Sequence, residues 1–174
     1  MKKKFIDYYM KIAEITAELS YAKRLKVGSV IVKGDKILAS GYNGMPAGWG
    51  NNCETKEYMS PDTGGWVEPE IVEERWPCVE YAGEFNDQPT RFALTTRPEV
   101  LHAESNAIAK VSGSTESSED ATLFVTTAPC IHCAKMIFQS GIKSVYYRDS
   151  YRDDSGIQFL EKGGISVNHY NNET

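Results

Sequence analysis

Apolar or small residues recur every three to four positions near the start of the chain, and this spacing predicts an amphipathic helix that ends near Ala22. Two short apolar runs follow, Val27–Val32 and Ile37–Tyr42, with the turn sequence Gly34-Asp35 between them. Two such runs around a short polar turn are typical of a β-hairpin. The residues with helical spacing are Phe5, Ile6, Tyr9, Ile12, Ala13, Thr16 and Leu19.

The second half of the chain alternates between predicted helices and predicted strands. Strands separated by helices lie parallel in a sheet, whereas the strands of a hairpin lie antiparallel. The sequence therefore predicts an α/β fold, a three-layer α/β/α sandwich with a mixed central sheet. The predicted elements are a helix over His102–Val111, a strand over Thr122–Thr127, a helix over Cys130–Gln139, a strand over Ser144–Tyr147, a helix over about Asp154–Lys162 and a strand over Ile165–Asn168.

A stretch from about Asn51 to Pro98 lacks clean periodicity and contains several prolines and glycines. We predict an irregular insertion here, with one helix around Glu68–Glu74. Long segments of this kind in compact domains tend to serve sites or interfaces. The length of 174 residues and the 41% hydrophobic content fit one domain over residues 1–174 that carries this insertion.

Two short motifs contain the chemistry, His102-Ala103-Glu104 and Pro129-Cys130-Ile131-His132-Cys133. A catalytic zinc needs three protein ligands and an open fourth position for water, and one imidazole with two thiolates meets this requirement. Cys130 and Cys133 would share one face at the first turn of a helix, whose N-terminus favours thiolate over thiol. We therefore predict a Zn²⁺ ion bound by His102, Cys130 and Cys133.

Glu104 is predicted to be the general acid and base rather than a ligand. Two thiolates offset the charge of the zinc and make the bound water less acidic, so a nearby base becomes more necessary. Glu104 would take a proton from water, deliver it to ring N3 of a cytosine, and assist the departure of ammonia. Alone, the Cys-x-x-Cys pair could be a redox pair or half of a structural zinc site. The combination of both motifs favours the hydrolytic deaminase site.

The formal net charge of −5 argues against binding of long nucleic acid through its phosphates. The cluster Lys23, Arg24 and Lys26 can hold a single nucleotide phosphate, or can be a solvated basic turn after the first helix. We expect no signal peptide and no membrane span. With four cysteines, two of them assigned to metal, a disulfide framework is not expected and a reducing cytoplasm fits.

In four segments the chain resembles the deoxycytidylate (dCMP) deaminases of the bacteriophage type, within the zinc-dependent cytidine-deaminase-like superfamily. The zinc motif marks the whole superfamily, whereas the Gly-Tyr-Asn-Gly-x-Pro loop is typical of the dCMP branch. The segments that carry the resemblance are residues 23–32, the loop from Gly41 to Gly48, residues 102–108 and residues 126–135.

The resemblance implies hydrolysis of dCMP to dUMP for thymidylate synthesis, by a homo-hexamer in the cytoplasm, the host cytoplasm if a phage encodes it. It also implies activation by dCTP and inhibition by dTTP, with Mg²⁺ on the effector triphosphate. The implied substrate contacts are Asn43 to the 3′-hydroxyl of the sugar, the Ala103 N–H to the pyrimidine carbonyl, the Thr127 carbonyl to the exocyclic amine, and Tyr151 near the base and phosphate. The implied effector contacts are Lys23, Arg24, Lys26 and Gly44.

Several alternatives remain open at the level of sequence. Tyr151 can be an ordinary strand-end tyrosine, and the glycines of the Gly41–Gly48 loop can serve tight turns only. Cys53 and Cys78 could bind a second zinc with His132 or His169, although no close spacing links them. The competing functions are a deaminase of tRNA or single-stranded DNA, and a zinc-stabilised module without catalysis.

Overall fold

The computed structural model describes residues 1–58, 79–81 and 89–171. The main elements follow the predicted order, and none of the helices among these residues is long and apolar enough to cross a membrane. Their bounds are α1 (Lys3–Glu18), β1 (Gly28–Lys33), β2 (Lys36–Tyr42), α3 (Ala103–Ser112), β6 (Thr122–Thr127), α4 (Ile131–Gln139), β7 (Ser144–Asp149), α5 (Ser155–Lys162) and β8 (Ser166–His169).

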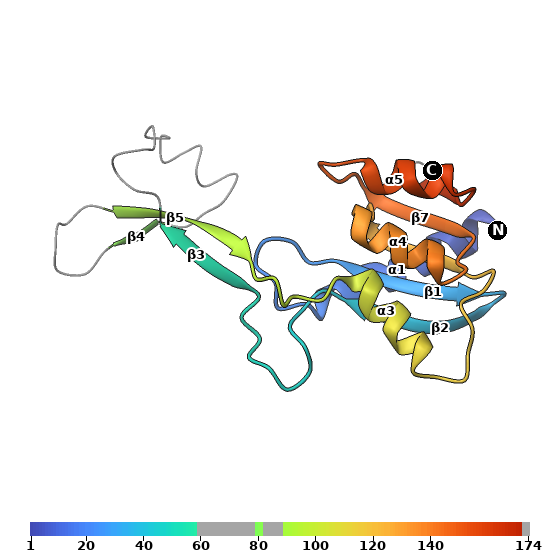
Figure 1. Cartoon of the computed structure of the whole chain (residues 1–174), viewed down its shortest axis with the longest axis horizontal. Helices are drawn as coiled ribbons and strands as arrows, with labels where there is room; N and C mark the ends of the chain where they lie inside the picture. Colours follow the sequence, from blue (N-terminus) through green and yellow to red (C-terminus); the bar gives the residue numbers. More distant parts are fainter. Residues whose placement is uncertain (59–78, 82–88, 172–174) are drawn as a thin grey trace.

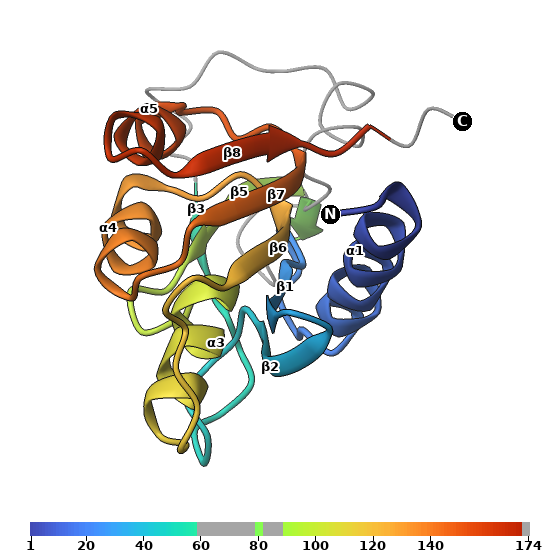
Figure 2. The same ribbon diagram turned by 90° about the vertical axis from the view of Figure 1, so that its right-hand side faces the viewer.

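These elements build a three-layer sandwich around a five-stranded sheet with the order β2-β1-β6-β7-β8. The hairpin strands β1 and β2 are antiparallel, β1 is antiparallel to β6, and β6, β7 and β8 are parallel. Figure 2 shows α1 on one face of the sheet, with α3, α4 and α5 on the other. The predicted α/β/α sandwich with a mixed central sheet is confirmed.

Alternate residues of the central strands point to opposite faces of the sheet, as the two-residue period of a β-strand requires. Val30 and Phe124 pack against α1, whereas Ile31, Leu123 and Val125 pack against the helices of the other face. These five side chains are fully buried, so strands β1 and β6 form the centre of the core. Asn43, which follows β2, and Thr127, the last residue of β6, lie at the edge of the sheet where the pocket described below is found.

The segment predicted to be irregular contains three strands in its described part, and this expectation was wrong for them. Strands β3 (Glu54–Tyr58), β4 (Val79–Tyr81) and β5 (Pro89–Thr96) form an antiparallel sheet with the order β3-β5-β4. Figure 1 shows this sheet extending away from the five-stranded sheet. The helix predicted around Glu68–Glu74 lies outside the described residues.

Close backbone contacts fix the N-terminus of α3 against strand β2. A Cβ atom at Gly41 would lie 2.2 Å from the carbonyl oxygen of Ala103, which only glycine avoids. The Ser29 hydroxyl of the neighbouring strand donates to the same carbonyl at 2.8 Å. The first turn of α3, which carries the predicted site residues, is therefore held rigidly at the end of the sheet.

Candidate metal centre and substrate pocket

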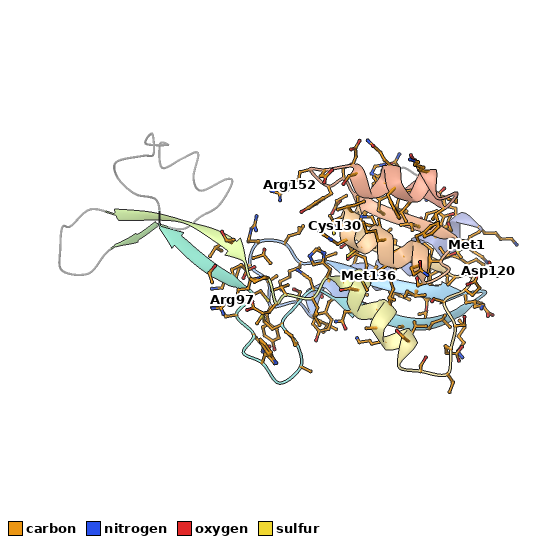
Figure 3. All side chains as sticks on the ribbon, viewed as in Figure 1. Met1, Arg97, Asp120, Cys130, Met136 and Arg152 are labelled. Carbon is orange, nitrogen blue, oxygen red and sulfur yellow. The ribbon has the colours of Figure 1, made fainter. Side chains whose placement is uncertain are left out.

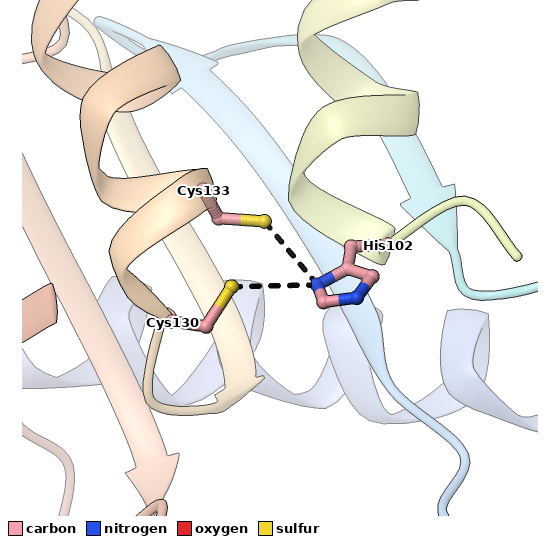
Figure 4. Close-up of side chains that lie close together, drawn as sticks. All are labelled: His102, Cys130 and Cys133. Carbon is pink, nitrogen blue, oxygen red and sulfur yellow. Dashed lines mark hydrogen bonds between the residues drawn. The ribbon is translucent and has the colours of Figure 1, made fainter. Parts of the chain in front are cut away.

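The N-termini of α3 and α4 converge, and the ligand atoms of the three predicted zinc ligands lie within 4.8 Å of one another where they meet. Figure 3 labels one of them, Cys130, at the start of α4. His102 is the N-cap residue of α3, Cys130 is the N-cap residue of α4, and Cys133 lies in the first turn of α4. Neither N-cap side chain makes a capping hydrogen bond. Both side chains point instead toward the space between the helices, as Figure 4 shows.

The distances between the three side chains fit a shared zinc ion. His102 Nδ1 lies 3.6 Å from Cys130 Sγ and 3.4 Å from Cys133 Sγ. Zinc–nitrogen and zinc–sulfur bonds of ordinary length at a tetrahedral angle place the two ligand atoms about 3.6 Å apart. Among the described residues, these three are the one group of three or more His, Cys, Asp or Glu side chains close enough to hold a metal.

The two cysteines have opposite protonation preferences. The hydrogen bond from Cys133, together with that from His102, lowers the pKa of Cys130 to about 3 against the effect of burial. The pKa of Cys133 is raised because its thiol donates to Cys130 and because it is buried. The hydrogen bond with Cys130 raises the pKa of His102, although burial opposes this. These two directions favour a thiolate on Cys130 and a thiol on Cys133 as long as no metal is bound.

Glu104 lies in the first turn of α3 and is 4% exposed. Burial is the largest cause that raises its pKa from 4.5 to about 7, while its own backbone N–H acts in the opposite direction. A carboxyl group that titrates near neutral pH can both accept a proton and return it. Its position beside the ligands, but outside their group, matches the acid–base role predicted from the sequence.

A pocket of about 340 Å³ opens onto this centre. It gathers all four residues that the resemblance assigns to the substrate, and Arg24 as well. Lys23 and Lys26 line a separate hollow at the end of α1, and Gly44 lies in neither, pairing through its backbone with Leu101. The pocket is lined by Ala22, Arg24, Leu25, Val27, Asn43, Glu54, Thr96, Val100, His102, Ala103, Glu104, Thr127, Ala128, Cys130, Tyr151 and Arg152.

Sequence reasoning missed several residues of the pocket wall, among them Glu54, Thr96, Val100 and Arg152. Glu54 and Thr96 face each other across strands β3 and β5, within the segment expected to be irregular. Arg152 follows Tyr151 directly, and its guanidinium lies 5.8 Å from the centre of the Tyr151 ring. In the sequence, only the position of Arg152 directly after the predicted substrate contact Tyr151 could have indicated that it lines the pocket.

Cys53 lies apart from the metal centre. It is buried in an apolar cluster with Ala22 and Val100, against which Met45 packs. Burial raises the pKa of the Cys53 thiol, which disfavours the thiolate that a metal would need. Among the described residues, Cys53 belongs to no group of three or more candidate ligands. Cys78, its partner in the second zinc site considered above, lies outside the described residues.

Residues 3–149 match the family described as the cytidine and deoxycytidylate deaminase zinc-binding region. The chain belongs to this family. The deoxycytidylate deaminases of Enterobacteria phages T2 and T4 are each 35% identical to it over 175 residues, which cover 91% of this chain and 88% and 86% of the phage proteins. A crystal structure of dCMP deaminase from the cyanophage S-TIM5, in complex with dCMP and dUMP, is 37% identical with a TM-score of 0.74. That match covers 98% of this deaminase-family chain and 99% of the cyanophage chain.

Proposed function

We propose that this chain is a zinc-dependent deoxycytidylate deaminase, which hydrolyses dCMP to dUMP and ammonia and so supplies dUMP for thymidylate synthesis. The observation that carries the proposal is the placement of a buried, protonatable Glu104 in one pocket with His102 and Cys130, which group with Cys133 as candidate metal ligands. The phage relatives named above support dCMP as the substrate.

His102, Cys130 and Cys133 would hold the zinc, and their nitrogen and two sulfur atoms form a donor set that suits this ion. Bound zinc activates water for attack at neutral pH. Glu104 would take a proton from the water that adds to C4 of the cytosine ring and deliver it to N3. It would then take the remaining proton of the added hydroxyl and pass it to the amine, which leaves as ammonia when the C4–N bond breaks and the C4 carbonyl forms. Its pKa near 7 suits both halves of this transfer.

The other pocket residues would orient the nucleotide. Ala103 is the first residue of α3, so its backbone N–H has no acceptor within the helix and can hold the pyrimidine carbonyl. Thr127, the last residue of β6, would receive the exocyclic amine at its carbonyl oxygen. Tyr151 would lie near the base, and Asn43 near the sugar. Arg152 adds positive charge to the pocket, which suits the 5′-phosphate.

The enzyme is expected to prefer dCMP over deoxycytidine and cytidine, since the phosphate supplies a charge-assisted anchor, and over CMP, since Asn43 is expected to read the sugar. Removal of the phosphate should lower kcat/KM by roughly 10- to 100-fold. Ammonia release from this panel, with single-stranded DNA added as a further substrate, checks the prediction. Faster release from single-stranded DNA than from dCMP would instead support the polynucleotide deaminase.

We also propose regulation by dCTP, bound with Mg²⁺, and by dTTP. Lys23 and Lys26 line a hollow of about 700 Å³ beside the substrate pocket, and Ala22 lines both. Arg24, between the two lysines, lines the substrate pocket. The resemblance assigns Gly44 to the effector together with the Lys23–Lys26 segment. An effector bound by this segment could shift the substrate pocket between two states, because the segment also contributes Arg24 to the pocket wall. Each effector must bind those states with different affinity.

Without effectors, the dependence of the rate on dCMP is expected to be sigmoidal, and dCTP with Mg²⁺ should make it hyperbolic. Inhibition by dTTP should be reversed by excess dCTP. Substitution of Lys26 by Ala should weaken dCTP activation, whereas Arg24→Ala should mainly raise the apparent KM for dCMP, because Arg24 lines the substrate pocket. Saturation curves at several effector concentrations test these expectations. Hyperbolic curves that respond to neither triphosphate would contradict the regulatory proposal.

We further propose that the chain assembles as a homo-hexamer. Support comes from the solvent-facing side of α1, where large apolar side chains stay exposed although the opposite side of the helix packs on the sheet. Contiguous exposed apolar surface on a helix commonly marks a protein contact. The cytoplasmic location expected from cysteine use stays a prediction. The exposed large apolar residues of α1 and its C-cap are Phe5, Tyr8, Ile15 and Leu19.

A further inference from the structure

Gly156 is buried in the first turn of α5 and lies directly against the backbone of the zinc-ligand segment. A Cβ atom at this position would lie 2.0 Å from the carbonyl oxygen of Pro129 and 2.8 Å from the carbonyl carbon of Cys130. The φ angle of Gly156 is not positive, so alanine could adopt the same backbone conformation, and a helix favours alanine over glycine. Glycine is therefore required here for space and not for conformation.

A methyl group at Gly156 would have to separate α5 from the ligand segment by about 1 Å, because Cβ atoms essentially never approach other heavy atoms within 3.0 Å. The atoms on the other side belong to the backbone, so no side chain can rotate away to make room. The bond lengths of a zinc site vary by only about 0.2 Å. A shift of this size at Cys130 therefore exceeds what a zinc site tolerates.

The packing of α5 determines which of the two segments moves. Figure 2 shows α5 beside α4 on the same face of the sheet. Leu160 of α5 is fully buried, and the ring of Phe159 packs edge-on against Phe138 of α4, with ring centres 5.9 Å apart. Cys130, in contrast, stands at the N-cap of α4 without a capping hydrogen bond from its side chain. Because α5 is fixed by its own packing, the separation has to open at Cys130.

We propose that Gly156 is a positioning residue of the metal centre, which lets α5 support the backbone of Cys130 from behind. This support keeps Cys130 Sγ 3.6 Å from His102 Nδ1, at the separation that a shared zinc ion needs. Gly156 does not line the substrate pocket, so it acts through Cys130. Residues behind the ligands of a metal contribute to its affinity by fixing the ligand geometry. The inference rests on the zinc site of the proposed function, but it needs no turnover.

Gly156→Ala should lower the affinity of the folded protein for Zn²⁺ by roughly 10- to 100-fold, measured by competition with a chelating dye. Gly113→Ala is the matched control, because a Cβ atom at this C-cap residue of α3 would meet nothing closer than 3.6 Å. It should keep the wild-type zinc affinity. Phe159→Leu weakens the packing of α5 without adding an atom beside Cys130. It should lower the unfolding temperature of the metal-free protein and leave the zinc affinity unchanged.

Wild-type zinc affinity in a folded Gly156→Ala protein would overturn the inference, because α5 would then give way instead of Cys130. So would an equal loss of affinity in Phe159→Leu, since general loosening of α5 would then explain the effect. Should Gly156→Ala not fold, hydrogen exchange of the wild-type protein replaces it. Zinc should slow amide exchange in α5 more than in α1, on the other face of the sheet, and equal slowing would overturn the inference.

Ammonia release from dCMP, measured on the same zinc-loaded wild-type protein, separates this inference from the proposed function. Absent deamination by a protein that binds zinc would refute the proposed function alone, because the comparison of zinc affinities stays valid. Wild-type zinc affinity in Gly156→Ala, together with normal deamination by the wild-type protein, would refute the role of Gly156 alone.

Discussion

Glu104→Gln is expected to lower kcat by roughly 10²-fold or more while the zinc content stays at the wild-type level. Glutamine is nearly isosteric with glutamate, and its neutral amide suits a site where burial already disfavours the carboxylate charge. The amide cannot take a proton from water or pass one to N3. Steady-state kinetics with dCMP, together with elemental analysis of the same sample, checks the prediction. Near-normal turnover by the zinc-loaded variant would remove Glu104 from the mechanism.

The same variant has a second readout, in the stability of the metal-free protein. Burial raises the pKa of Glu104 from 4.5 to about 7, so the folded state favours the protonated form. The contribution of Glu104 to the free energy of unfolding is therefore complete below pH 4.5 and is lost as the pH rises to about 7. Glutamine does not titrate. Relative to Glu104→Gln, the metal-free wild type should lose stability across this interval in denaturant titrations.

Cys133→Ser is expected to reduce zinc content and activity together and to lower the unfolding temperature. Cys133 is 3% exposed at the first turn of α4, 3.4 Å from His102 Nδ1. A serine hydroxyl does not replace the thiolate as a soft ligand, and the binding energy of a metal held by the fold also stabilises the fold. Cys130→Ser should act in the same way.

Elemental analysis, kinetics and thermal unfolding of the two serine variants measure this loss. Cys53→Ser is the matched control, because Cys53 is buried in an apolar cluster away from the metal centre. That variant should retain its zinc and lose only stability. Full zinc occupancy and ordinary activity in either Cys130→Ser or Cys133→Ser would show that the residue is not a ligand.

The sequence by itself determined the α/β/α architecture and which residues form the candidate metal centre, because both depend on local spacing. Apolar periodicity separated helices from strands, and their alternation predicted which strands are parallel. Residues within one helical turn have fixed relative positions. His102 and Glu104 at the start of one helix, and Cys130 and Cys133 at the start of another, could therefore be assigned before their convergence was known.

The tertiary structure decided what depends on contacts between distant segments. Strand β3 brings Glu54 to the backbone of Lys23 and Arg24, across some 30 residues of chain that carry no motif for this contact. The path after α1 also separates Arg24, in the substrate pocket, from Lys23 and Lys26, in the neighbouring hollow. The same path brings the Asn43 side-chain amide into hydrogen bonds with the Val27 N–H and the Leu25 carbonyl. Local spacing fixes side chains only within a turn of helix or along a strand, whereas strand register and loop path arise from packing and hydrogen bonds formed across the whole fold.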